Sequence, residues 1–266
     1  MKRWLPFVKS GPVVSVLRLS GPIAATARGN ALSDASLAQM IERAFRKGRP
    51  DAVALALNSP GGSPVQSALI AARIRRLAEE HEVPVHAFVE DVAASGGYWL
   101  ACAADVIWVD RSSIVGSIGV IYAGFGLNEF IARYGVERRV HTAGESKSFL
   151  DPFQPEKPED IDRLVKLQTP IHEAFKEHVR SRRGKRLKTE ENLFTGDVWV
   201  GQQAVDIGLA DGVGHLVPVM KDRFGSKTRF VLHTPRRGLW SRLGAPSVSD
   251  VAGEIEARAL WARYGL

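Results

Sequence analysis

The chain has 266 residues, of which 45% are hydrophobic and 24% charged, as in a globular protein with a full core. Its single cysteine, Cys102, excludes an internal disulfide. The sequence contains no run of about 18 apolar residues, so we expect no transmembrane helix. The net charge of +7 favours anionic partners such as nucleic acid or an acidic lipid surface.

Strands and helices alternate along the first half of the sequence. Short apolar runs predict strands at residues 12–19, 52–57, 84–89 and 106–109. Helical spacing predicts one helix that begins at Ser33 or Asp34 and a second that carries the apolar residues from Val65 to Leu77. Such alternation predicts βαβ units around a mostly parallel sheet flanked by helices.

The second half continues the pattern less regularly. We expect a helix at 127–134, a strand at 136–141, a loop at 143–149 and a long helix through residues 161–175. A basic stretch at 180–188, a turn at 194–197 and a helix at 201–209 follow. Residues 235–249 resemble a linker and 251–264 a terminal amphipathic helix. We therefore divide the chain into a domain at 1–225 and a C-terminal arm at 226–266.

Two glycine-rich turns, at 58–62 and 93–97, follow predicted strands and precede predicted helices. In open α/β sheets the active site gathers at the carboxyl ends of the strands. Ser95 in the second turn would have free backbone N–H groups beside its hydroxyl, which suits a nucleophile. The amides of Gly62 and Gly96 would form an oxyanion hole. The alternatives are that Ser95 caps a helix and that the glycines form a plain turn.

A serine nucleophile needs a base, and the sequence offers no obvious histidine. None occurs between His86 and His141, and Gly-x-Ser-x-Gly, His-Glu-x-x-His and P-loop motifs are absent. Lys147 is the remaining candidate. A lysine accepts a proton near neutral pH only where burial disfavours its charged form. Phe149, Leu150 and Phe153 could enclose such a pocket, whereas the alternative is a solvated surface lysine.

Several motifs in order resemble the signal peptide peptidase A family. They are Asn-Ser-Pro-Gly-Gly at 58–62, Ala-Ala-Ser-Gly-Gly-Tyr-Trp at 93–99, Val-Gly-Ser-Ile-Gly-Val at 115–120, Glu-Ser-Lys-Ser-Phe-Leu-Asp-Pro-Phe at 145–153 and Phe-Thr-Gly-Asp-Val-Trp-Val-Gly-Gln-Gln-Ala at 194–204, followed by Gly-Leu-Ala-Asp at 208–211. The resemblance runs from about Pro12 to Val213 and fits the short, single-repeat form of the family. It implies a crotonase/Clp-protease-like fold of repeated ββα units.

The resemblance also implies a Ser–Lys dyad that needs no metal or organic cofactor. Ser95 matches the nucleophile, Lys147 the general base, and Ser117 a hydroxyl that orients the lysine amine. Gly62 and Gly96 match the oxyanion donors. The implied activity is that of a serine endopeptidase that hydrolyses signal-peptide remnants or other extended apolar peptides through an acyl-enzyme. The implied assembly is a homo-oligomer, with an octamer as the expected size.

We expect a cytoplasmic protein, because Lys9 interrupts the apolar residues that a signal peptide would need. Peripheral contact with an anionic membrane is an additional expectation. The residues that could make it are Trp4, Phe7, Trp240, Leu243, Trp261 and Tyr264. Two other classes of function stay open: an inactive scaffold of the same fold, and a basic nucleic-acid-binding protein that uses residues 180–188. Nucleic acid is not the expected partner, since no base-reading motif accompanies this stretch.

Overall fold

The computed structural model describes residues 11–25, 31–144, 147–188, 192–234 and 258–266. The chain divides into two compact units. Unit 1 comprises Met1–Ile118 and Lys176–Leu266, and unit 2 comprises Gly119–Phe175. Each unit is described by itself below.

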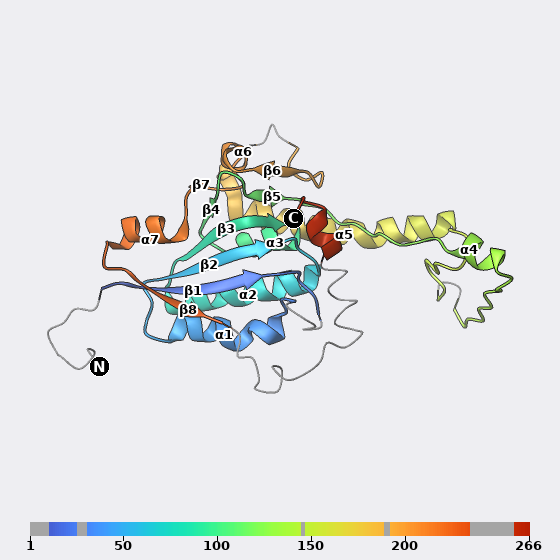
Figure 1. Ribbon diagram of the computed structural model, residues 1–266, viewed down its shortest axis with the longest axis horizontal. Coiled ribbons are helices and arrows are strands. Elements are labelled where there is room, and N and C mark those ends of the chain that lie inside the picture. The colour runs from blue at the N-terminus through green and yellow to red at the C-terminus, as the bar shows by residue number, and fades with distance from the viewer. Residues whose placement is uncertain (1–10, 26–30, 145–146, 189–191, 235–257) are drawn as a thin grey trace. The chain divides into compact units, whose positions relative to one another are not determined.

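Unit 1 is built on one sheet of eight strands (Figure 1). They are β1 (Val13–Ser20), β2 (Ala52–Ser59), β3 (Val85–Ala94), β4 (Val106–Val109), β5 (Ile114–Gly116), β6 (Val198–Val200), β7 (Gly212–Val213) and β8 (Arg229–His233). Their order is β6-β5-β3-β2-β1-β8; off this path, β4 pairs with β3, and β7 pairs with β4. All pairs of these strands are parallel except β5 with β6, which confirms the predicted mostly parallel α/β sheet.

The central strand β3 changes partner along its length. Its first half pairs with β4, and its last three residues pair with β5, where Ala94 lies opposite Gly116. On its other side β3 follows β2, with a register shift between Leu57 and Ser59. Because β2, β3 and β5 are parallel, the turns that follow them lie at the same edge of the sheet.

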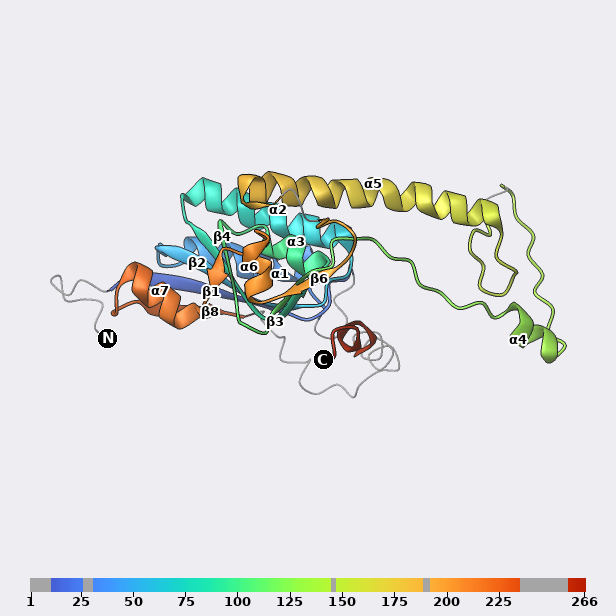
Figure 2. The ribbon, with the colours of Figure 1, turned by 90° about the horizontal axis from the view of Figure 1, so that it is seen from above.

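Helices cover both faces of this sheet (Figure 2). α2 (Pro64–His81) packs between α1 (Asp34–Arg46) and the short α3 (Gly96–Ala101) on one face. On the other face, α7 (Leu216–Phe224) buries Met220 against apolar side chains of β1, β2 and β3. The cap of α1 is confirmed at Ser33, whose hydroxyl accepts a hydrogen bond from the N–H of Ser36 at 3.3 Å.

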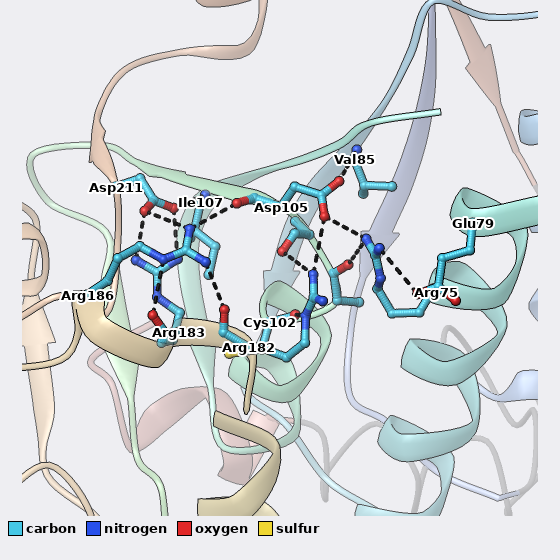
Figure 3. A network of polar contacts seen from close by, with 12 residues as sticks. Arg75, Glu79, Val85, Cys102, Asp105, Ile107, Arg182, Arg183, Arg186 and Asp211 are labelled. Carbon is cyan, nitrogen blue, oxygen red and sulfur yellow. Dashed lines mark hydrogen bonds and ion pairs between the residues drawn. The ribbon is translucent and has the colours of Figure 1, made fainter. Parts of the chain in front are cut away.

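Arginines fasten the end of α5 (Pro158–Arg183) and the following turn η2 (Gly184–Arg186) within unit 1 (Figure 3). The side chain of Arg183 is 1% exposed and forms a two-point ion pair with Asp211, at 2.8 and 3.0 Å. Arg186 contacts the same carboxylate at 3.3 Å, and Arg182 contacts Asp105 at 3.3 Å. Three arginines of the basic stretch are therefore engaged inside the fold.

Unit 2 holds α4 (Asn128–Arg133) and the first part of α5. Local polar contacts organise it: Leu127 donates its N–H to the carbonyl of Pro152 at 2.6 Å, and Arg138 pairs with Asp151 at 3.1 Å. Among its described residues, Phe175 alone is buried. Unit 2 thus has almost no hydrophobic core of its own.

Some expectations differ from the structure. Residues 136–141 do not form the predicted strand; Val136 is exposed, and these residues pair with no other strand among those described. The predicted arm includes β8, which pairs with β1 in the sheet. The predicted linker at 235–249 and residues 251–257 of the terminal helix lie outside the described residues, whereas 258–262 are helical.

Of the six residues expected to contact a membrane, the structure describes two. Trp4, Phe7, Trp240 and Leu243 lie outside the described residues, and Trp261 and Tyr264 are half-buried. Within the described part of the chain, no helix combines the length and the apolar character that crossing a bilayer requires.

Candidate active site

Ser95 lies at the sharp turn between β3 and α3. Its backbone adopts φ 52° and ψ −121°, a left-handed conformation that is rare outside glycine and costs energy. Ser95 occupies the N-cap position of α3, but its side chain makes no capping hydrogen bond, so its hydroxyl does not serve as a helix cap. Ser95 is half-buried, and its hydroxyl has no partner among the described residues. The hydroxyl is therefore available for chemistry.

Backbone hydrogen bonds hold Ser95 from both sides. Its N–H donates to the carbonyl of Gly116 at 2.8 Å, which ties the turn to the end of β5. Its carbonyl accepts the N–H groups of Tyr98 and Trp99, both at 3.0 Å, which ties the turn to α3. The strained conformation is thus fixed by the surrounding strand and helix. The missing Gly-x-Ser-x-Gly motif does not prevent a strand–turn–helix placement of the serine.

The Gly62 amide is presented toward Gly96. Ile23 donates its N–H to the carbonyl of Gly61 at 2.8 Å and accepts the N–H of Ser63 at 2.8 Å. In a trans peptide the C=O and the next N–H point in opposite directions, so the Gly62 N–H points away from Ile23. A Cβ placed on Gly96 would lie 3.3 Å from the Gly62 nitrogen. The two predicted oxyanion donors are therefore neighbours.

Side chains that sequence reasoning missed support these turns. The buried Ser59 hydroxyl accepts the Gly61 N–H at 3.2 Å. The buried Ser67 on α2 donates to the Ser63 carbonyl at 2.9 Å, and its oxygen lies where a Cβ on Gly96 would be. Ile23 holds Gly62. The hydrogen bonds of Ser59 and Ser67 are local, but the approach of Ser67 to Gly96 and the contact of Ile23 with the first turn join distant parts of the chain, so the sequence carries no signal for them.

Ser117 follows β5 directly beside this turn. Because Ala94 lies opposite Gly116, the next residues on the two parallel strands are Ser95 and Ser117. Ser117 also has a positive φ of 51°, and its N–H donates to the carbonyl of Asp197 at 2.7 Å. The segment 194–197 therefore helps to position Ser117.

Lys147 belongs to unit 2, apart from the other four predicted site residues, which all belong to unit 1. It is exposed, and its N–H donates to the carbonyl of Gly144 at 3.2 Å. Glu145 and Ser146 lie outside the described residues. The structure therefore groups Ser95, Ser117, Gly62 and Gly96 but leaves the Ser–Lys pairing untested.

All residues of α3, the helix that follows Ser95, are buried. Tyr98 and Cys102 are fully buried, and burial raises the pKa of the Tyr98 hydroxyl and raises the pKa of the Cys102 thiol to about 12. Cys102 is consequently an uncharged core residue and not a nucleophile. No group of His, Cys, Asp or Glu side chains among the described residues could hold a metal ion.

Comparison with known proteins places the chain among peptidases. The model of "Peptidase family S49" matches residues 78–223. The chain is 32% identical to "Serine protease SPPA, chloroplastic" of Arabidopsis thaliana, over 76% of this chain and 29% of that protein. It is 30% identical to "Putative protease SohB" of Buchnera aphidicola, over 77% of this chain and 57% of that protein.

A stronger match has a different name. The chain is 46% identical to "Na(+)/H(+) antiporter NhaA" of Brucella melitensis, over 100% of this chain but only 39% of that protein. The chain thus spans less than two thirds of each of these relatives, and the antiporter name describes the longer Brucella protein.

Two solved structures share the fold. Both are mutants of the 1510-N membrane-bound stomatin-specific protease, and one is in complex with a substrate peptide. Each superposes with a TM-score of 0.53, at 13% and 14% identity, and they cover 94% and 84% of this chain and 99% of their own.

Proposed function

The chain belongs to peptidase family S49, and from this membership and the geometry around Ser95 we propose that it is a serine endopeptidase with a Ser95–Lys147 dyad. The observation that carries the proposal is the strained, unpartnered Ser95 beside the neighbouring Gly62 and Gly96. A serine held at positive φ next to aligned amides is arranged for nucleophilic attack rather than for stability.

The proposed mechanism proceeds through an acyl-enzyme. Neutral Lys147 takes the Ser95 proton as the serine oxygen attacks a peptide carbonyl. The amides of Gly62 and Gly96 stabilise the resulting oxyanion. The lysine ammonium then gives its proton to the leaving amine. Finally, the same amine deprotonates a water molecule, which hydrolyses the ester and regenerates Ser95. Ser117 would accept or donate a hydrogen bond that orients the lysine amine.

We propose extended apolar peptides, such as remnants of signal peptides, as the substrates. This class comes from the family resemblance. Peripheral contact with an anionic membrane would deliver such peptides, and the net charge of +7 favours that contact.

Unit 2 supports the proposal that the active form is a homo-oligomer. Large apolar side chains are exposed along it, among them Ile121 at 66%, Phe125 at 84% and Tyr134 at 71%. A segment that buries so little cannot stabilise itself, and apolar surface of this extent marks an interface. A second copy that covers unit 2 would also remove water from Lys147, which is exposed in the single chain. Loss of that water would favour the neutral amine.

Charge introduced into this surface tests the assembly. Phe125→Asp should reduce the mass in sedimentation at micromolar concentration and abolish peptide hydrolysis, because a carboxylate at a buried interface is costly. Val217→Asp on α7, an exposed apolar residue of unit 1, is the matched control. An unchanged mass for Phe125→Asp, or an equal loss for Val217→Asp, would contradict the assignment of unit 2 as the interface.

The dyad is tested with peptide hydrolysis and with labelling by a fluorophosphonate probe, which reacts with activated serines. Ser95→Ala should lose both, and Lys147→Ala should lose both while keeping the wild-type circular dichroism spectrum. Lys185→Ala, which removes a lysine of the basic stretch, is the control and should keep activity. Hydrolysis that survives in Lys147→Ala would rule out the dyad, and a wild-type protein that neither hydrolyses peptides nor reacts would favour the inactive scaffold.

The nucleic-acid alternative receives little support. Arg182, Arg183 and Arg186 bind carboxylates and carbonyls of their own chain, so they are not free for phosphates (Figure 3). Binding of RNA or DNA with a steep dependence on salt would revive it.

A further inference from the structure

The end of α3 opposite Ser95 is held by a histidine of α5. The Nε2 atom of His178 lies 3.1 Å from the carbonyl oxygen of Trp99. The His178 ring also stacks on the indole of Trp99, with centroids 4.9 Å apart and planes 17° apart. One side chain of α5 therefore contacts both the main chain and the ring of the same α3 residue.

The chemistry of this contact fixes its direction. A carbonyl oxygen only accepts hydrogen bonds, so Nε2 of His178 carries the proton and donates it to Trp99. Burial lowers the pKa of His178. The ring is therefore neutral near pH 7 and has a single N–H, which is directed at Trp99.

Trp99 links this donor to the nucleophile in one step. Its N–H donates to the carbonyl of Ser95 at 3.0 Å, while its own carbonyl accepts from His178. The hydrogen-bonded path from the side chain of His178 to the backbone of Ser95 thus passes through one residue. α3 has only six residues and all of them are buried, so the contact at Trp99 lies close to Ser95 in a tightly packed segment.

We propose that His178 is a positioning residue that sets the place of the Ser95 hydroxyl and the Gly96 N–H through Trp99. The proposal rests on the proposed function, because it assigns His178 a role in the reaction at Ser95. An error of about 1 Å in the place of a reacting group can lower a rate about a hundredfold. The strained backbone of Ser95 makes such an error easy, since relaxation of the turn would be favourable.

Arg182, one turn further along α5, has a different role. It donates to the carbonyls of Cys102 at 2.8 Å and Ala104 at 3.1 Å, which follow α3 and belong to the loop before β4. Among the hydrogen bonds described, His178 is therefore the donor on α5 that reaches a residue within α3. The proposed positioning acts through this N–H.

Two substitutions separate the hydrogen bond from the stacking. His178→Phe keeps a ring against Trp99 but removes the donor. His178→Gln keeps an amide N–H that can reach the Trp99 carbonyl but removes the ring. Ser181→Ala is the matched control, because the Ser181 hydroxyl donates to the His178 carbonyl within α5, at 2.8 Å, and has no hydrogen bond to α3 among those described.

The test measures kcat and KM on an extended apolar peptide, the rate of Ser95 labelling by the fluorophosphonate probe, and the midpoint of thermal unfolding. We expect His178→Phe to lower kcat and the labelling rate about tenfold to a hundredfold with KM nearly unchanged. His178→Gln should recover most of both rates although it is the less stable of the two variants. Ser181→Ala should match the wild type.

The outcomes distinguish this inference from the proposed function. A labelling rate of His178→Phe equal to that of the wild type would overturn the positioning role alone. The positioning role would also be overturned if His178→Gln, the less stable variant, had lower kcat and labelling rates than His178→Phe. A wild-type protein that the probe does not label at Ser95 would overturn the proposed function, and the positioning role with it.

Discussion

A Cβ atom placed on Gly61 would lie 2.8 Å from the Cβ of Ser95. The two glycine-rich turns are therefore in direct contact, and the first turn has no room for a side chain. The same added atom would lie 2.8 Å from the Gly96 nitrogen and 2.7 Å from the Ala94 carbonyl oxygen. These distances are shorter than van der Waals contact, and the atoms involved are mostly backbone that cannot swing aside.

Gly61→Ala should therefore damage the site more than the fold. The added methyl group would push Ser95 and Gly96 apart from Gly62, so we expect peptide hydrolysis and probe labelling to fall more than a hundredfold. The free energy of unfolding should fall by about 1–3 kcal/mol, as in overpacked cores. Peptide hydrolysis measures the loss of activity, and urea unfolding measures the loss of stability.

Gly48→Ala is the control for backbone strain alone. Gly48 has a positive φ of 84°, as Gly61 has at 98°, but nothing lies within 4 Å of its added Cβ. It should lose about 1 kcal/mol of stability and keep its activity. Equal activity losses in the two variants would show that strain, and not contact between the turns, explains the effect.

Ser117→Ala tests whether this hydroxyl serves the reaction. The variant keeps the N–H that donates to Asp197, so the turn after β5 should keep its shape. We expect kcat to fall about tenfold to a hundredfold, since the lysine amine would lose its orienting partner. Ser112→Ala, an exposed serine before β5, should leave kcat unchanged. Wild-type kcat in Ser117→Ala would remove Ser117 from the proposed mechanism.

The fold elements that the sequence predicts well are those with local signals. Helical spacing and the Ser33 cap identify α1, and short apolar runs identify β1, β2 and β4. The strands β5, β6 and β7 have two or three residues each, too few for a periodic pattern to emerge. The expected strand at 136–141 shows the converse: a segment forms a strand only where another strand can pair with it, and none of the described strands pairs with these residues.

The candidate site divides in the same way. The glycines and Ser95 are evident in the sequence because each turn carries its own signal. The roles of Ile23, Ser67 and His178 are not, because they depend on which distant backbone groups these residues meet. The basic stretch is the clearest case: its composition indicates a solvated surface, whereas Arg183 is buried and paired with Asp211, which lies 28 residues further along the chain.

The Arg183–Asp211 pair should be essential for stability. Arg183 is almost fully buried, so removing its partner would leave an unpaired charge inside unit 1. Asp211→Asn should lower the free energy of unfolding by about 3–5 kcal/mol. Glu80→Gln, which breaks the exposed Arg76–Glu80 pair, should cost about 0.5 kcal/mol or less. Urea unfolding compares them, and a similar small loss for both would show that Arg183 finds other partners.

Acidification should destabilise the protein through three histidines. Burial lowers the pKa of His86, His178 and His233 below the ordinary value of 6.5. Their folded forms therefore bind protons less readily than the unfolded chain does, and stability rises with pH in the range where the two states differ. Full stability should hold above about pH 7.5, and the free energy of unfolding should fall as the pH drops through 6.5.

His86 offers the sharpest test of this pH dependence. It is 2% exposed, and its Nδ1 has no hydrogen-bond partner among the described residues, so a protonated ring would be poorly accommodated. His86→Leu should lose less stability than the wild type between pH 7.5 and pH 5 in urea unfolding. His81→Gln, at the exposed end of α2, should follow the wild-type curve, because this side chain is in solvent in both states. A His86→Leu curve parallel to the wild type would exclude His86 as a source of the acid sensitivity.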